Sequence, residues 1–81
     1  MKYFVYILQS NKTKKFYTGS CQDTDIRLGE HNSGQVRSTK SGVPWTLIKL
    51  EEFLTRQDAY KRERQIKSYK GGEAFRNLIN S

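Results

Sequence analysis

The segment FYTGSCQDTDIRLGEHN, residues 16–32, places a phenol, a guanidinium and an imidazole close together along the chain. Tyr17 lies in what reads as a strand, and Arg27 and His31 lie four residues apart on what reads as a helix. Two residues at that spacing share one helical face and are about one turn apart. The segment is therefore either a surface helix that follows a hairpin or one half of an active site.

A second phenol is expected on the same face of a sheet. Tyr6 lies in the strand-like segment that precedes Tyr17, and a polar turn separates the two strands. If Gln9 and Lys14 flank this turn, Tyr6 lies directly across from Tyr17, and every register of the same parity leaves both rings on one face. Simple aromatic pairing across two strands would also explain the two tyrosines.

Glu63 lies near the inward side of a later helix. At 100° per residue, it falls within about 40–60° of the apolar stripe that contains Ala59 and Ile66. A carboxylate in such a position is costly unless a cation meets it. Three partners are open: Arg27 in a salt bridge, Lys67 at i+4 on the exposed side, or a bound metal ion.

The elements that must position these side chains follow from local patterns. Asp23 or Thr24, and later Thr55, can cap two helices, and Gly34 and Gly71 are placed to end them. We expect strands at 2–9, 16–20 and 45–53, helices from 23 or 24 to about 32 and from 56 to about 70, a loop at 33–44 and a short helix at 73–81. A hairpin at the start predicts a largely antiparallel sheet and the α+β class, in the order ββαβα plus a short C-terminal helix.

Composition and charge indicate the cellular compartment of the protein and the class of molecule that it binds. We expect 81 residues to form a single domain (1–81), and fifteen Lys and Arg against eight Asp and Glu give a net charge of +7, which favours a polyanion such as nucleic acid or merely serves solubility. The lone Cys21 excludes an internal disulfide and leaves no zinc-site spacing, which favours a reducing compartment. The longest apolar run, FVYIL, is far shorter than the ~20 residues of a membrane span, and no signal peptide is evident. A cytoplasmic protein is expected.

Several short motifs, in the right order, resemble the GIY-YIG nucleases. VYI (5–7) and YTG (17–19) resemble the two halves of the signature that names the family, and RLxxHN (27–32), the strand after Pro44 and AxxxExxIK (59–67) extend the match. The first motif lacks the leading glycine and keeps the tyrosine, and the second has Thr18 where the signature has isoleucine. The chain is most similar to small stand-alone proteins that resemble the nuclease domain of the bacterial excision-repair endonuclease.

The resemblance implies a three-stranded antiparallel sheet flanked by helices and metal-dependent hydrolysis of phosphodiester bonds in DNA. It implies the catalytic residues Tyr6, Tyr17, Arg27, His31 and Glu63, with Glu63 as the protein ligand of Mg²⁺ or Mn²⁺. Mg²⁺ often takes only one or two carboxylates, so one can suffice. A cation beside a tyrosine favours its phenolate, so Tyr17 or Tyr6 is a candidate general base, with Tyr17 preferred. We expect Arg37, Lys40, Lys67 and Lys70 to contact the DNA backbone.

Three functions remain open at this point. The first is an endonuclease in DNA repair or processing, directed by DNA structure, branched or single-stranded, rather than by sequence. The second is a nucleic-acid-binding module of the same fold with little or no turnover. The third is an adaptor that binds a protein, which would show salt-insensitive binding and no affinity for DNA.

Overall fold

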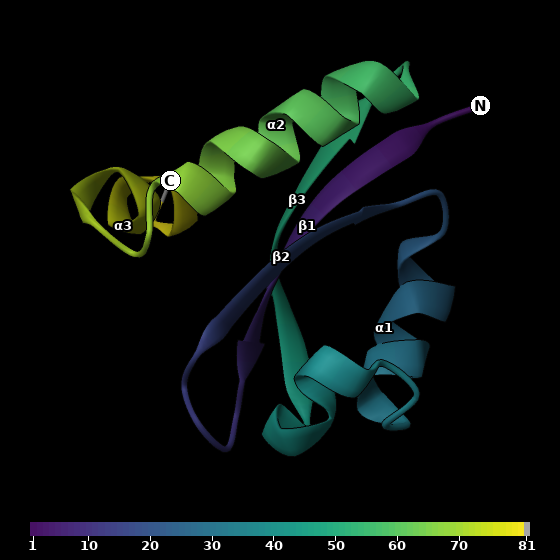
Figure 1. The fold of residues 1–81 in the computed structure, drawn as a ribbon. Coiled ribbons are helices and arrows are strands. Elements are labelled where there is room, and N and C mark those ends of the chain that lie inside the picture. The colour runs from purple at the N-terminus through teal and green to yellow at the C-terminus, as the bar shows by residue number, and fades with distance from the viewer. Residues whose placement is uncertain (81) are drawn as a thin grey trace.

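The computed structural model, which describes residues 1–80, has a three-stranded antiparallel sheet with helices packed on both of its faces (Figure 1). The strand order is β2-β1-β3, with β1 in the centre. In chain order the elements are β1 (Tyr3–Ser10), β2 (Phe16–Cys21), α1 (Thr24–Asn32), the 3₁₀ helix η1 (Arg37–Gly42), β3 (Trp45–Phe53), α2 (Arg56–Ser68) and α3 (Glu73–Ile79). The expected α+β class and element order are confirmed, and Ser81, which we expected to end the last helix, lies outside the described residues.

The central strand is buried on both faces because helices cover both sides of the sheet. Its Val5 and Ile7 pack against Ala59 and Ile66 of α2 and Phe75 of α3. The alternate residues, Tyr6 and Leu8, form a second cluster with Trp45, and Leu28 of α1 packs against it. Figure 1 shows α2 and α3 on one side of the sheet and α1 and η1 on the other. Tyr6 therefore faces α1, whereas α2 covers the opposite face.

The β1–β2 register differs from the one we considered for a short turn. Tyr6 pairs with Gly19 and Tyr17 pairs with Leu8, so the two tyrosines are not directly opposite. The turn is longer because Ser10 closes it: its amide donates to the Lys15 carbonyl at 2.9 Å. The parity is nevertheless the expected one, and both phenol rings lie on the α1 face of the sheet.

The segment at 33–44, which we expected to be a loop, contains η1. Trp45 anchors it: the indole Nε1–H donates to the Thr39 carbonyl at 2.9 Å. A Cβ at Gly42 would lie 2.5 Å from Cζ2 of Trp45, so the residue at this position must be small. A tertiary contact with a single tryptophan thus orders a segment whose local pattern indicates only a loop.

The ends of the longer helices agree with the expected signals. The side chain of Asp23 accepts from the amide of Ile26, and that of Thr55 accepts from the amide of Asp58. Gly71 has a φ of +72°, and α2 ends at Ser68, two residues before the expected end. Among residues 1–80, no helix has the length and apolar character needed to cross a membrane.

Candidate active site

A chain of hydrogen bonds joins β1, α1 and η1 on the α1 face of the sheet. Nε of Arg27 lies 3.4 Å from the Tyr6 hydroxyl, which lies 2.9 Å from Nε2 of His31. Nδ1 of His31 lies 2.8 Å from Oγ1 of Thr39, and that hydroxyl donates to the Val36 carbonyl. Of the residues implied by the resemblance, the structure therefore connects three directly, Tyr6, Arg27 and His31.

The partners of His31 determine its tautomer. Because the Thr39 hydroxyl donates to Val36, its oxygen accepts the proton on Nδ1 of His31. Nε2 is then an acceptor, and the Tyr6 hydroxyl donates to it. The imidazole is completely buried, and burial and the charge of Arg27 lower its pKa below the ordinary value of 6.5. His31 is therefore neutral near pH 7, and each donor in the chain points from Arg27 towards Val36.

Arg27 enters this chain as a permanent cation. Hydrogen bonds to Tyr6 and Glu30 raise its pKa, and its NH1 group lies 2.9 Å from the Glu30 carboxylate. The salt bridge to Glu30 replaces the one to Glu63 that we had left open. Because Nε and NH1 are held and the side chain is about one-third exposed, the rest of the guanidinium faces solvent in a fixed orientation.

Tyr6 behaves differently from the expectation that a nearby cation favours the phenolate. Burial raises its pKa to about 12, and this effect outweighs the opposing hydrogen bond and charge of Arg27. Its ring is 2% exposed, so the cost of a buried charge dominates. Tyr6 is therefore a neutral donor at physiological pH, and the expectation of an activated phenolate is wrong for this residue.

Tyr17 lies beside this chain and is more accessible than Tyr6. Its ring meets that of His31 edge to face at 5.0 Å and that of Tyr6 at 6.3 Å. Its side chain is partly exposed. Of the two phenols, Tyr17 is the one that solvent can reach.

Glu63 projects from the flank of α2 that faces β2. On α2, Arg62 bonds both carboxylate oxygens of Glu51 on β3, so that flank of the helix faces β3. Glu63 is 100° further round the helix, towards β2, since Ala59 and Ile66 point down onto β1. The hydrogen-bond partner of Glu63 is Lys67, not Tyr6, Tyr17, Arg27 or His31. Glu63 approaches the edge strand β2 from the opposite face of the sheet.

Two hollows along the seam between α2 and β2 bracket Glu63. The lysine hollow, about 530 Å³, is lined by Lys15, Tyr17, Thr18, Lys67 and Lys70 among others. The tyrosine hollow, about 680 Å³, includes Tyr3, Ser20, Arg56 and Tyr60. Along α2, the lysine hollow begins three residues after Glu63, at Ile66, and the tyrosine hollow ends three residues before it, at Tyr60. Tyr17 therefore connects the two parts of the site, because it both touches His31 and lines the lysine hollow.

Lys67 is the partner of Glu63. Its Nζ lies 2.6 Å from Oε2 of Glu63, whose side chain is only 14% exposed. The inward position and the i+4 pair therefore occur together, and Lys67 is the partner that the structure shows among those left open. Among residues 1–80, no three His, Cys, Asp or Glu side chains cluster to hold a metal ion. A hard ion such as Mg²⁺ can take a single carboxylate and fill its other ligand positions with water and phosphate, so Glu63 is the residue that would hold it.

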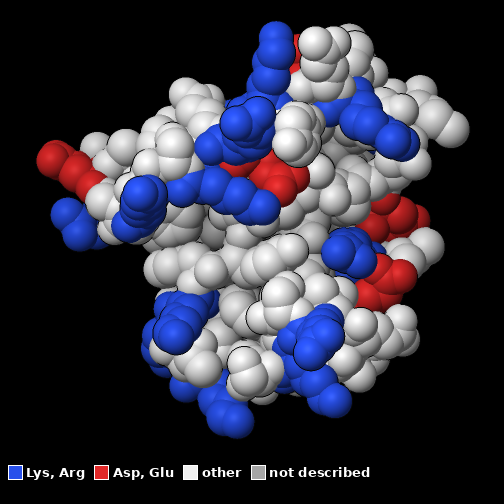
Figure 2. Space-filling model, in the orientation of Figure 1, with Lys and Arg blue, Asp and Glu red and all other residues white. Residues whose placement is uncertain are grey.

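The expected DNA-contacting cations lie on both sides of the edge strand. Lys67 and Lys70 belong to the α2 side, and Arg37 and Lys40 are exposed on η1. Figure 2 shows basic side chains over α2 and, below an uncharged band in the position of β2, over the hairpin turn and η1. A polyanion along β2 would lie between these two groups of cations.

Three residues of the site were missed by reasoning from the sequence. Thr39 fixes the His31 tautomer, and Glu30 holds Arg27 in place of the expected partner. Gly19 pairs with Tyr6, and a Cβ there would lie 2.4 Å from the Tyr6 hydroxyl. Only Gly19 had a sequence signal, as the glycine that ends the YTG motif. Thr39 and Glu30 are ordinary polar residues until the fold places them.

Comparison with known proteins places the chain in a family. The model of the GIY-YIG catalytic domain matches residues 2–74, so the chain belongs to the GIY-YIG family. It is 39% identical over 69 residues to a UPF0213 protein of Staphylococcus epidermidis, covering 84% of this chain and 83% of that protein. A UPF0213 protein of Haloquadratum walsbyi is 38% identical over 68 residues, covering 83% of this chain and 75% of that one. The solution NMR structure of a UPF0213 protein from Bacillus halodurans is 29% identical and covers 93% of this chain and 92% of its own, with a TM-score of 0.51.

Proposed function

We propose that the chain is a metal-dependent endonuclease that hydrolyses phosphodiester bonds of DNA, directed by DNA structure rather than sequence, in repair or processing. The observation that carries the proposal is the hydrogen-bond chain that holds a partly exposed Arg27 against Tyr6 and His31. The chain belongs to a family whose domain is described as catalytic. A fixed guanidinium on a cationic face suits a phosphate group better than a neutral substrate.

Arg27 is the residue that binds the reacting phosphate. A guanidinium matches two phosphate oxygens, and its charge opposes the negative charge that builds on them during hydrolysis. Tyr6 and Glu30 hold Nε and NH1, so the free N–H groups have one orientation. His31 and Thr39 in turn hold Tyr6, and these three act on the phosphate through Arg27.

Tyr17, as a phenolate, is the group that accepts the proton of the attacking water. It is partly exposed and borders the lysine hollow, where a phosphate can enter. Tyr6, with a pKa of about 12 and its hydroxyl donating to His31, is poorly suited to that step. Catalytic groups of this type contribute about 10²–10⁴-fold to the rate.

Glu63 is the residue that would hold Mg²⁺ or Mn²⁺. Such an ion, when bound, neutralises charge on the phosphate and on the departing oxygen. Glu63 approaches β2 between the two hollows, and Lys67 would turn from the carboxylate towards the DNA backbone. Lys67, Lys70, Arg37 and Lys40 then give affinity without sequence information.

Cleavage of a panel of branched, nicked and single-stranded DNA, with and without Mg²⁺, tests this function. Arg27→Ala and Glu63→Ala should each lower the cleavage rate by about 10²–10⁴-fold. Glu52→Ala is the matched control, because its exposed carboxylate lies on β3 and pairs with Lys2 at 3.5 Å. Wild-type rates for both the Arg27 and Glu63 variants would remove the proposed site.

A binding module with little turnover is the second candidate, and the Lys67–Glu63 pair favours it. A lysine at 2.6 Å already satisfies the carboxylate that would bind the metal. Gel shifts that need no metal, together with no cleavage of any DNA in Mg²⁺ or Mn²⁺, would select this candidate over the nuclease.

A further inference from the structure

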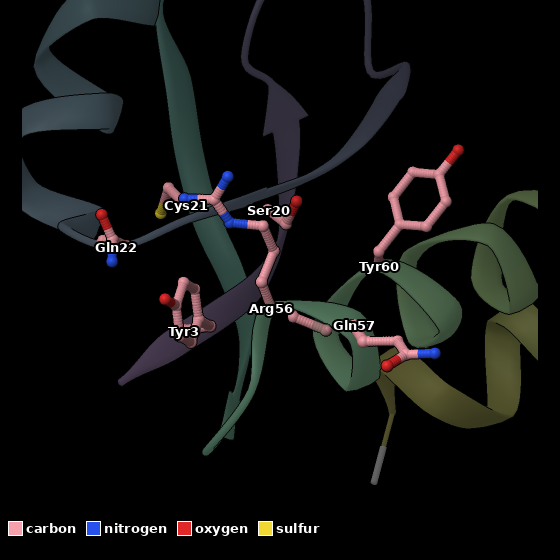
Figure 3. A pocket seen from close by; sticks show the side chains of 8 residues that line it. Tyr3, Ser20, Cys21, Gln22, Arg56, Gln57 and Tyr60 are labelled. Carbon is pink, nitrogen blue, oxygen red and sulfur yellow. The ribbon is translucent and has the colours of Figure 1, made fainter. Parts of the chain in front are cut away.

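The tyrosine hollow has the chemistry of a site for a planar aromatic group. The guanidinium of Arg56 lies over the ring of Tyr3, 5.7 Å from its centroid, and that of Arg64 lies at the same distance over Tyr60. Arg56, Tyr3 and Tyr60 all line this hollow. In Figure 3 the Arg56 side chain rises between Tyr3 and Tyr60, with its guanidinium beside Ser20.

Hydrogen-bonding groups also line this hollow. Ser20 supplies a hydroxyl, and Gln22 and Gln57 supply carboxamides that both donate and accept. Aromatic and guanidinium planes stack on bases, and amide groups recognise base edges, so the set matches an unstacked nucleobase. The hollow of about 680 Å³ is within the usual range for ligand pockets and is large enough for a base with its sugar.

We propose that the tyrosine hollow binds one unstacked base of a single DNA strand whose backbone crosses Glu63 to the lysine hollow. A base inside a duplex offers no free face, so this site selects single-stranded or flapped DNA. Tyr60 and Lys67 are seven residues apart on α2, about 10 Å along its axis, with Glu63 between them. The inference rests on the proposed function and names the substrate class for it.

Binding measured in EDTA separates this base site from catalysis. The probes are fluorescent single strands of about 12 nucleotides, within the usual site size: oligothymidylate and an abasic strand of equal charge. Wild-type protein should bind the thymidylate strand about tenfold more tightly, because base–aromatic stacking is lost with the abasic strand. Tyr60→Ala should abolish this preference and leave the affinity for the abasic strand unchanged, whereas Tyr60→Phe should retain it.

Leu54→Ala is the matched control: Leu54 and Tyr60 are 78% and 53% exposed, so neither variant should disturb the core. Equal affinity of wild type for the two strands, or no binding of either, would overturn the base site. The same conclusion follows if Tyr60→Ala and Leu54→Ala behave alike. Free thymidine monophosphate that competes as well as the strand would overturn the assignment to a strand.

Cleavage in Mg²⁺, measured separately, keeps the two proposals apart. If the protein cleaves DNA in Mg²⁺ but shows no preference for the thymidylate strand in EDTA, the result contradicts the base site in the tyrosine hollow and leaves the nuclease intact. A base preference that disappears in Tyr60→Ala, without cleavage, supports the hollow and contradicts the nuclease.

Discussion

Gly19 lies opposite Tyr6 in the β1–β2 ladder, and the Tyr6 hydroxyl occupies the space that a side chain at Gly19 would fill. A Cβ at this position would lie 2.4 Å from the hydroxyl and 2.6 Å from Cζ of the ring. The ring cannot retreat, because its hydroxyl is bonded to His31 inside the sheet–helix interface. Packing of the Tyr6 ring thus requires glycine at position 19, the last residue of the YTG motif.

Gly19→Ala should therefore destabilise the protein, by about 1–3 kcal/mol, as overpacking of a core does. Gly29→Ala is the matched control, since a Cβ there meets nothing within 4 Å and the residue is exposed in the middle of α1. Its free energy of unfolding should rise by up to about 1 kcal/mol, from helix propensity. Urea denaturation of both variants measures the contrast, and a Gly19→Ala protein as stable as wild type would show that Tyr6 is free to move.

Tyr6→Phe should mainly lower the stability of the protein, whereas Tyr17→Phe should mainly lower its activity. Tyr6→Phe leaves the buried Nε2 of His31 without its donor, so the free energy of unfolding should fall by about 1–3 kcal/mol. Tyr17→Phe should leave stability nearly unchanged and lower DNA cleavage by about 10²–10⁴-fold. Thermal unfolding and single-turnover cleavage test the pair, and full activity in Tyr17→Phe would exclude Tyr17 as the base.

His31 should make stability depend on pH. Its pKa is lowered in the folded state, so below the unfolded value of 6.5 the unfolded state takes up the proton first. The buried neutral imidazole therefore contributes fully to the free energy of unfolding above pH 6.5. This contribution is lost as the pH falls below 6.5, by at most about 1.4 kcal/mol per pH unit. Urea denaturation at about pH 7.5 and about pH 5.5 measures this loss.

Because the sequence has a single histidine, NMR can check the cause directly. The imidazole nitrogens should show a neutral ring with the proton on Nδ1 at pH 7. A proton on Nε2, or a titration midpoint above 6.5, would contradict the hydrogen-bond chain.

Lys67→Gln should strengthen metal binding, because it removes the cation that Glu63 now contacts. Paramagnetic relaxation of water by Mn²⁺ should show several-fold tighter binding than in wild type, and Glu63→Gln should bind weakly. Lys61→Gln, an exposed α2 lysine on the solvent side, removes the same charge and should resemble wild type. Equal Mn²⁺ affinity in wild type and Glu63→Gln would exclude Glu63 as the ligand.

The sequence alone determined the features that depend on local geometry. Alternation along a strand put Tyr6 and Tyr17 on one face in every register of that parity, and the helical period put Arg27 beside His31. The sequence also predicted an N-cap at Asp23 or Thr24, because a side-chain oxygen there can bond an amide two or three residues later, and Asp23 is the cap in the structure. Alternation, helical periodicity and capping need only neighbouring residues, so the α+β class and element order followed from them.

Only the tertiary structure decided the partners and the charges. The Tyr6–Gly19 register depended on a turn that Ser10 lengthens, and η1 depended on Trp45. Burial of Tyr6 by segments distant in sequence raises its pKa, although the adjacent Arg27 acts in the other direction. Desolvation depends on everything that packs around a group, and a linear pattern of residues does not contain that information.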